Sequence, residues 1–228
     1  MIFRIITTQP NIYDSFLKNG LIARGLLKKI INIKLYDLHD FAFDKHRTID
    51  DTPAGGGAGM VLKVDVMANA INKIRDPNDK CRIILLTPQG KKFEQSDAKR
   101  LAKEKNIILI AGRFEGYDER IRDLVDEEIS IGDFVLTSGD LPVQTIIDAT
   151  SRMIPGFIEK SESINEESFE IRHSDFGFLL EYPQYTRPID FEGKKVPDVL
   201  LSGDHGKIKN WRNEKSVERT SERRPDII

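Results

Sequence analysis

The sequence predicts an α/β domain with a mostly parallel sheet, followed by a small, mainly helical unit. Three observations support this prediction. Apolar segments typical of strands alternate with helical patterns across residues 1–157. Two of these segments, 81–87 and 106–112, are almost wholly apolar, as in strands buried on both faces of a sheet. After residue 158 the chain becomes polar and acidic, and the alternation ends.

The expected elements follow a regular order. Residues 1–7 (MIFRIIT) favour a strand, residues 11–30 carry apolar side chains at helical spacing, and residues 31–38 (INIKLYDL) alternate with period two, like a strand. A polar loop, 39–60, follows. The remaining elements, in chain order, are a helix at 64–74, strand 81–87, a helix at 96–105, strand 106–112, a short helix at 118–125, short strands at 127–132 and 134–137, and a helix at 141–154.

Three regions are expected. Residues 1–157 form the α/β domain, and residues 158–178, which include EKSESINEESFE, form a flexible linker. Residues 179–228 hold an apolar segment, a turn and one helix or more. The last region is rich in lysine and arginine around Trp211, which suits either an RNA backbone or an ordinary solvated helix.

Composition narrows the class of protein. Of the 228 residues 39% are hydrophobic, which is enough for a core, and 35 Lys and Arg nearly balance 37 Asp and Glu. The single cysteine, Cys81, excludes an internal disulfide. The first residues do not resemble a signal peptide, and no apolar run approaches the ~18 residues of a membrane span. We therefore expect a soluble cytoplasmic protein with no membrane partner.

Four glycine-bearing turns follow, or lie beside, expected strands. They are Thr87–Gly90, Gly112–Gly116, Gly132-Asp133 and Ser138–Asp140. Glycine lets a backbone approach a ligand closely, and ligands of open α/β sheets bind beyond the carboxyl ends of the strands. The turns therefore predict a pocket for an adenine ring and a ribose, although each turn alone is also ordinary loop chemistry. The glycine-rich loop 50–60 is either a floppy linker or a surface for a flat ligand such as a base.

Several familiar sites are missing from the sequence. No G-x-G-x-x-G follows the first strand, and there is no P-loop and no G-x-S-x-G elbow. The four histidines are scattered without paired ligand spacing, so no metal site is expected.

Seven longer segments carry a recognisable pattern, in this order: DDTPAGGGAGM, LLTPQG, AGRFEGYDERI, SIGDFVLTSGDLP, SRMIPG, LLEYPQYTRP and VPDVLLSGDHGKIKNWR. Together they closely resemble the bacterial tRNA (guanine-N1)-methyltransferases of the SPOUT superfamily, over nearly the whole chain. The resemblance implies a deep trefoil knot in the first domain, an exception to un-knotted topology. It also implies S-adenosylmethionine bound in the knot and a homodimer with shared active sites. The implied substrate is the guanosine at tRNA position 37 when a guanosine precedes it, with the anticodon arm gripped by the C-terminal domain.

The resemblance assigns residues to binding. The implied cofactor contacts are Leu85, Leu86, Thr87, Pro88, Gly112, Glu115, Gly116, Ile131, Gly132, Phe134, Leu136, Ser138 and Gly139. The implied substrate contacts are Asp50, Gly59, Glu181, Tyr185 and Arg187. Ser138 departs from the family, which commonly has glycine there, and this could narrow the pocket. Magnesium assistance is also implied, although no ligand cluster identifies a site.

The catalytic residues implied by the resemblance are an arginine and a carboxylate. Arg152 matches the arginine proposed to stabilise charge on guanine O6. The family often has Asp-Ser-Phe as the general base motif, and here Glu167-Ser168-Phe169 takes its place, followed by an apparent insertion before Leu179. Glu167 is therefore the preferred base, and Asp175 competes with it if the insertion lies on the other side.

Three functions stay open at this point. The first is the methyltransferase. The altered stretch around Glu167 also allows an RNA-binding protein that keeps the fold but has lost catalysis, although the intact glycine turns argue for a cofactor. The third is an α/β enzyme for another nucleotide, which would not respond to tRNA.

Overall fold

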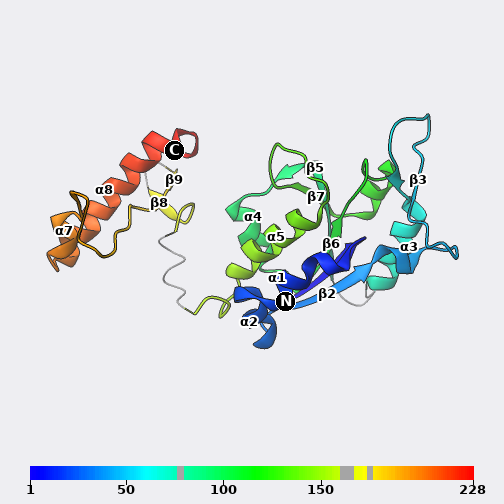
Figure 1. Cartoon of the computed structure of the whole chain (residues 1–228), viewed down its shortest axis with the longest axis horizontal. Helices are drawn as coiled ribbons and strands as arrows, with labels where there is room; N and C mark the ends of the chain where they lie inside the picture. The colour runs from blue at the N-terminus through cyan, green and yellow to red at the C-terminus, as the bar shows by residue number, and fades with distance from the viewer. Residues whose placement is uncertain (76–79, 160–166, 174–176) are drawn as a thin grey trace. The chain divides into compact units, whose positions relative to one another are not determined.

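The computed structural model describes residues 1–75, 80–159, 167–173 and 177–228. These residues form two compact units, Met1–Ile158 and Glu159–Ile228 (Figure 1). The first contains a five-stranded sheet in the order β2-β1-β6-β5-β7, in which every pairing is parallel. The α/β class with a mostly parallel sheet is thus confirmed for this unit.

Each sheet strand arises from an apolar stretch of the sequence. The strands are β1 (Ile2–Thr7), β2 (Asn32–Asp37), β5 (Arg82–Lys92), β6 (Asn106–Ala111) and β7 (Glu127–Ser130). All six residues of β6 are buried, because it lies inside the sheet with both faces covered.

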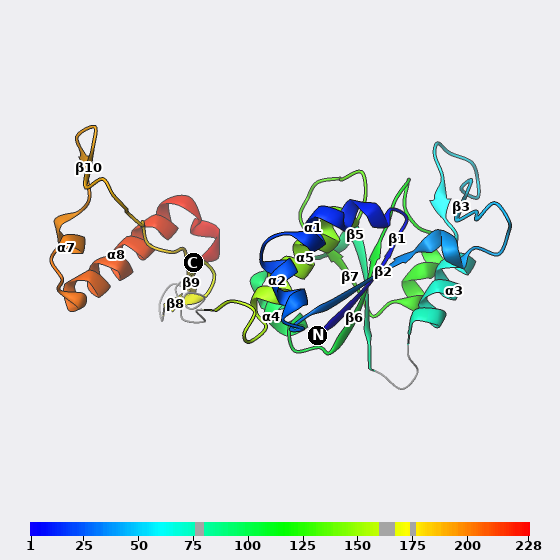
Figure 2. The same cartoon turned by 60° about the horizontal axis from the view of Figure 1, so that its bottom comes forward.

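Helices cover both faces of the sheet, as Figure 2 shows from the edge. One face packs against α1 (Asp14–Lys18), α2 (Gly20–Leu27), α4 (Gln95–Leu101) and α5 (Asp140–Arg152). The other face packs against α3 (Val64–Ile74) and the 3-10 helices η2 (Leu38–Phe41) and η3 (Glu119–Leu124). Side chains along β6 alternate between the two cores, with Ile107 and Leu109 on one side and Ile108 and Ile110 on the other.

Two element predictions were wrong. The expected helix 11–30 is divided into η1 (Pro10–Tyr13), α1 and α2, because Asn19 is extended and Gly20 has a positive φ of 66°. The expected strand 134–137 is a loop without a ladder partner among the described residues. Its apolar residues Phe134 and Val135 are 53% and 85% exposed, so hydrophobicity here does not mark a buried strand.

Two short antiparallel pairs complete the larger unit and begin the smaller one. In the first unit, β3 (Asp50–Asp51) pairs with β4 (Val61–Leu62) and encloses the glycine-rich loop. In the second unit, β8 (Ile171–His173) pairs with β9 (Gly177–Leu179). This pair lies within the segment 158–178 that was expected as a linker, so part of that segment has regular structure.

The rest of the second unit centres on one long helix. It contains β10 (Asp190–Phe191), β11 (Lys194–Lys195), α7 (Asp198–Leu201), α8 (His205–Arg223) and η4 (Pro225–Ile227). The fully buried Thr220 of α8 links the helix to β9, because its hydroxyl accepts a hydrogen bond from the Leu180 amide at 2.9 Å. Among the described residues, no helix is long and apolar enough to cross a lipid bilayer.

Candidate active site

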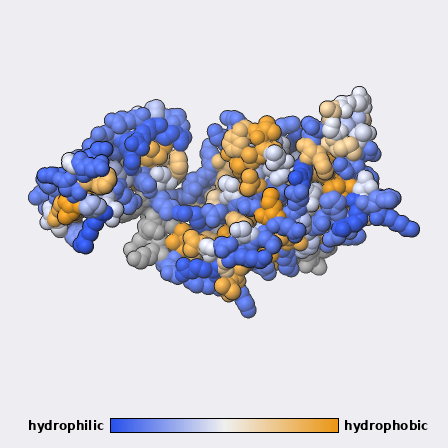
Figure 3. All heavy atoms as spheres, viewed as in Figure 1, coloured by the Kyte–Doolittle hydropathy of each residue, from blue (hydrophilic) through white to orange (hydrophobic). Residues whose placement is uncertain are grey.

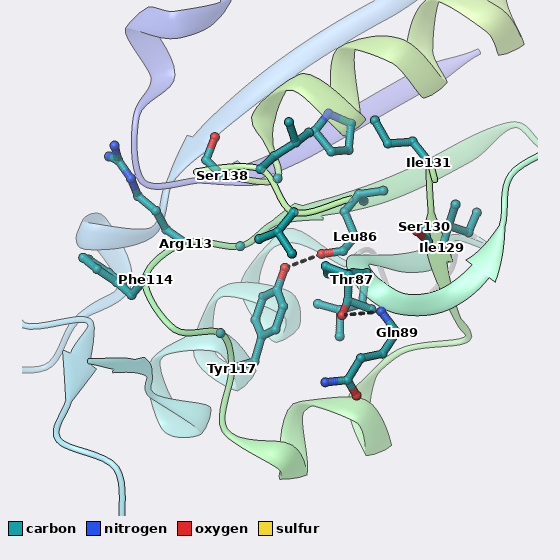
Figure 4. Close-up of a pocket in the computed structure, with 18 of the residues that line it drawn as sticks. Leu86, Thr87, Gln89, Arg113, Phe114, Tyr117, Ile129, Ser130, Ile131 and Ser138 are labelled. Atoms are coloured by element: carbon teal, nitrogen blue, oxygen red, sulfur yellow. Dashed lines mark hydrogen bonds between the residues drawn. The ribbon is translucent and has the colours of Figure 1, made fainter. Parts of the chain in front are cut away.

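A cavity of about 300 Å³ lies at the carboxyl edge of β5, β6 and β7. Four chain segments line it, 85–89, 112–119, 129–132 and 134–139, together with Arg122 and Pro142 (Figure 4). The four glycine-bearing turns of the sequence thus meet at one place. All thirteen residues that were expected to contact a cofactor line this cavity.

The turns pack so closely that two of the glycines have no room for a side chain. A Cβ on Gly139 would lie 2.7 Å from the Gly112 nitrogen, and the Gly139 amide donates a hydrogen bond to the Gly112 carbonyl at 2.8 Å. A Cβ on Gly90 would lie 2.5 Å from the Ile129 nitrogen. Gly90 belongs to the part of β5 where the pairing with β7 shifts register. Glycine is needed at both positions because another backbone passes against it.

Tyr117 links two walls of the cavity and was missed by the sequence reasoning. Its hydroxyl donates a hydrogen bond of 2.6 Å to the Leu86 carbonyl, at the end of the regular β5 ladder (Figure 4). Burial raises the pKa of the Tyr117 phenol well above its usual range, so the phenol stays a donor. Arg122 makes a second link, because its Nη2 donates to Gln89 Oε1 at 2.6 Å.

The cavity wall is apolar and open to solvent at residues 134–136. Phe134, Val135 and Leu136 are exposed, as is Phe114, which also lines the cavity. Figure 3 shows hydrophobic side chains gathered over the loops beside β5 and β7. A patch of this kind commonly marks a binding surface.

The glycine-rich loop lies beside the cavity. The Glu115 amide donates to the Met60 carbonyl and the Leu62 amide to the Gly116 carbonyl, both at 3.0 Å. A Cβ on Gly59 would lie 2.3 Å from the Glu115 side chain. The expected substrate residue Gly59 therefore contacts the expected cofactor residue Glu115. Asp50 stands at the other end of the loop, in β3.

The expected catalytic residues fall in different units. Arg152 ends α5 in the first unit. Glu167 lies in a turn of the second unit, where its carbonyl accepts a hydrogen bond from the Glu170 amide at 3.1 Å. Asp175 lies outside the described residues.

The other expected substrate residues also lie in the second unit. The Glu181 amide donates to Ser168 Oγ at 3.1 Å, which places Glu181 beside the turn that carries Glu167. Tyr185 lies against Trp211 of α8, with ring centroids 6.4 Å apart. Arg187 follows two residues later, at a bend outside the helices and strands. Aromatic rings beside basic residues are the surface type that stacks on unpaired bases.

In the part of the chain that the structure describes, no group of three or more His, Cys, Asp or Glu side chains is arranged to hold a metal ion.

Comparison with known proteins decides the family. The family model of tRNA (Guanine-1)-methyltransferase TrmD matches residues 1–228. The chain belongs to this family. Relatives named tRNA (guanine-N(1)-)-methyltransferase extend over most of both chains. The protein of Citrifermentans bemidjiense is 45% identical over 100% of this chain and 90% of its own, and that of Clostridium acetobutylicum is 46% identical over 98% and 89%. The protein of Persephonella marina is 44% identical over 100% and 88%.

Proposed function

We propose that this chain transfers a methyl group from S-adenosylmethionine to N1 of the guanosine at position 37 of tRNA. Membership of the tRNA (Guanine-1)-methyltransferase family over the full chain is the observation that carries the proposal. The cavity fits the cofactor in chemical type. It offers backbone donors and acceptors at close-packed glycines, and apolar side chains that suit an adenine ring. When bound, S-adenosylmethionine supplies an activated methyl group.

Guanine chemistry defines what the protein must do. N1 carries a proton at neutral pH, so a base has to remove that proton before the lone pair can accept the methyl group. A positioned carboxylate contributes typically ~10²–10⁴-fold to such a step. Negative charge then develops on O6, where an arginine stabilises it. We assign the base to Glu167, with Asp175 as its competitor, and the O6 contact to Arg152.

The two units have separate tasks in this proposal. The first unit, with a trefoil knot at the cavity, binds the cofactor, and the glycine-rich loop with Asp50 and Gly59 receives the base. The segment 158–178 links the units. Residues 179–228 bind the anticodon arm, with Glu181, Tyr185 and Arg187 as contacts beside the basic helix α8. Because the substrate is a tRNA, we place the enzyme in the cytoplasm. Magnesium would assist the reaction without a preformed protein site.

A homodimer would complete the active site. Phe134, Val135 and Leu136 expose an apolar surface at the cavity, which a second copy of the chain would cover. The partner copy would then bring the RNA-binding unit, with its base, to the cofactor. This arrangement explains why Arg152 and Glu167 lie in different units of one chain.

The test is single-turnover methyl transfer to a tRNA with guanosines at positions 36 and 37, with the product mapped at N1. We expect transfer by the wild type and no transfer to a tRNA with adenosine at position 37. Loss of the chemical step in Glu167→Ala, with Asp175→Ala and the neighbouring Glu170→Ala active, supports the assigned base. If only Asp175→Ala is inactive, the function stands and the base is Asp175. If the wild type binds tRNA without transfer, the chain is an RNA-binding protein and the proposal fails.

A further inference from the structure

Asp140 is a buried carboxylate directly behind the wall of the cavity. It is the first residue of α5 and is only 1% exposed. Its neighbours Ser138, Gly139 and Pro142 all line the cavity, while Asp140 itself does not. Figure 4 shows Ser138 where the lining loop runs into α5. The carboxylate therefore lies one layer of chain away from any ligand in the cavity.

Two hydrogen bonds hold the carboxyl group of Asp140 in place. Its Oδ1 accepts from Thr7 Oγ1 at 2.7 Å and from the Tyr13 hydroxyl at 2.9 Å. Its position at the N-terminus of α5 adds the favourable helix dipole. Among the described residues, however, no lysine, arginine or histidine forms an ion pair with Asp140. This is unusual, because buried charges are ordinarily paired with an opposite charge.

The field of Asp140 reaches the cavity. The pKa of Tyr117, whose ring lines the cavity, is raised first by burial and further by the negative charge of Asp140, against lowering effects of the Gly112 backbone and of the positive charge of Arg122. A negative charge that acts on a lining side chain also acts on a ligand beside it, and with little screening in a buried site.

We propose that Asp140 is a positioning residue that makes the cavity prefer a positively charged sulfonium to the neutral thioether that remains after methyl transfer. This inference rests on the proposed function, because it takes S-adenosylmethionine as the ligand. The missing counter-charge of Asp140 is supplied by the bound cofactor and disappears when the methyl group leaves. The same carboxylate therefore strengthens binding of the donor and contributes no such attraction to the neutral product.

The test measures binding to the full-length protein in the absence of tRNA, so that it does not depend on turnover. Isothermal titration calorimetry is run with S-adenosylmethionine, with sinefungin, which carries a cationic amine at the reacting position, and with neutral S-adenosylhomocysteine. Asp140→Asn keeps the shape and one acceptor oxygen while removing the charge. We expect it to weaken both cationic ligands about tenfold more than the neutral one, which corresponds to about 1.4 kcal/mol.

Two further variants separate charge from structure. Asp97→Asn removes another buried carboxylate, which pairs with Arg100 and does not line the cavity, and it should leave the ratio of affinities unchanged. Tyr13→Phe removes one donor to Asp140 but keeps the charge, so the preference for cations should stay or rise. If Asp140→Asn does not fold, a fall of the cation preference in Tyr13→Phe still overturns the inference, and a rise supports it.

The outcomes are distinct. An equal loss for all three ligands in Asp140→Asn, or no loss for any, overturns the inference while leaving the methyltransferase intact. A fall of the cation preference in Tyr13→Phe overturns it as well. If the wild type binds none of the three ligands, both the inference and the proposed cofactor are wrong.

Discussion

The contact between Gly112 and Tyr117 gives the sharpest test of the cavity geometry. A Cβ on Gly112 would lie 1.9 Å from the Tyr117 hydroxyl oxygen and 2.1 Å from the ring carbon that bears it. Gly112 is not among the glycines with positive φ, so alanine meets no backbone strain there. The three nearest contacts of the new methyl group all belong to the Tyr117 side chain, so the main cost of Gly112→Ala is the collision with it. Overpacking of this kind costs about 1–3 kcal/mol of unfolding free energy.

A double-mutant cycle isolates this cause. Tyr117→Ala removes the ring and should by itself cost about 2–4 kcal/mol, because it deletes packing and leaves the Leu86 carbonyl without its donor. In Gly112→Ala/Tyr117→Ala the collision is absent, so the combined loss should be smaller than the sum by about 1–3 kcal/mol. Gly112→Ala/Tyr117→Phe is the matched control, because phenylalanine keeps the colliding ring carbon. It should show less relief, because it removes only the hydroxyl oxygen at 1.9 Å and keeps the ring carbon at 2.1 Å.

Urea unfolding followed by far-UV circular dichroism measures these free energies. The single tryptophan, Trp211, lies in the second unit, so its fluorescence follows the unfolding of that unit separately. The packing described for this wall is refuted if the loss of unfolding free energy in the double variant equals the sum of the two single losses to within about 0.5 kcal/mol. An unchanged stability of Gly112→Ala refutes it as well.

Three other expectations follow from local contacts. Gly90→Ala should lower unfolding free energy by more than about 1 kcal/mol, since its Cβ would meet backbone of β7 that no rotamer change can move, and thermal unfolding measures this. Thr220→Val should destabilise the second unit by about 1–3 kcal/mol, read from Trp211 fluorescence, because the partly buried Leu180 amide loses its acceptor. The hydrogen bond from Arg120 lowers the pKa of Asp118 from 3.8 in the unfolded chain to about 2. The small stabilisation that this carboxylate provides is therefore complete above pH 3.8 and is lost as the pH falls through about 2. In Arg120→Ala, carboxyl NMR titration should find this pKa raised towards 3.8, and an unchanged value would contradict the pairing.

Local pattern was sufficient for most of the larger unit. The strands at 81–87 and 106–112 were predictable because a strand buried on both faces must be apolar at every position. The helix of α5 was predictable because Pro142 fits a first turn and apolar residues recur at helical spacing. The same rule failed at 134–137, where Phe134 and Val135 are apolar yet exposed. An apolar surface for a ligand or partner has the same local composition as a strand, and only tertiary contacts distinguish them.

The site shows the same division between local and distant information. The glycine turns identify the cavity because glycine is needed where a ligand or a neighbouring segment passes close to the backbone. The alternation of strands and helices in an α/β protein brings such turns to one edge of the sheet. Nothing in the sequence near Asp140 reveals its role, because its partners Thr7 and Tyr13 lie 133 and 127 residues away. Tyr117 is similarly ordinary in sequence and acquires meaning only through the Leu86 carbonyl, 31 residues distant. Residues that contact a ligand lie in turns with a recognisable local sequence. Residues that support the cavity wall from behind, or place a charge there, are identified only by contacts between segments far apart in the sequence. For this reason the predicted cofactor contacts lie in the cavity lining, and the residues that sequence reasoning missed lie behind it or tie its walls together.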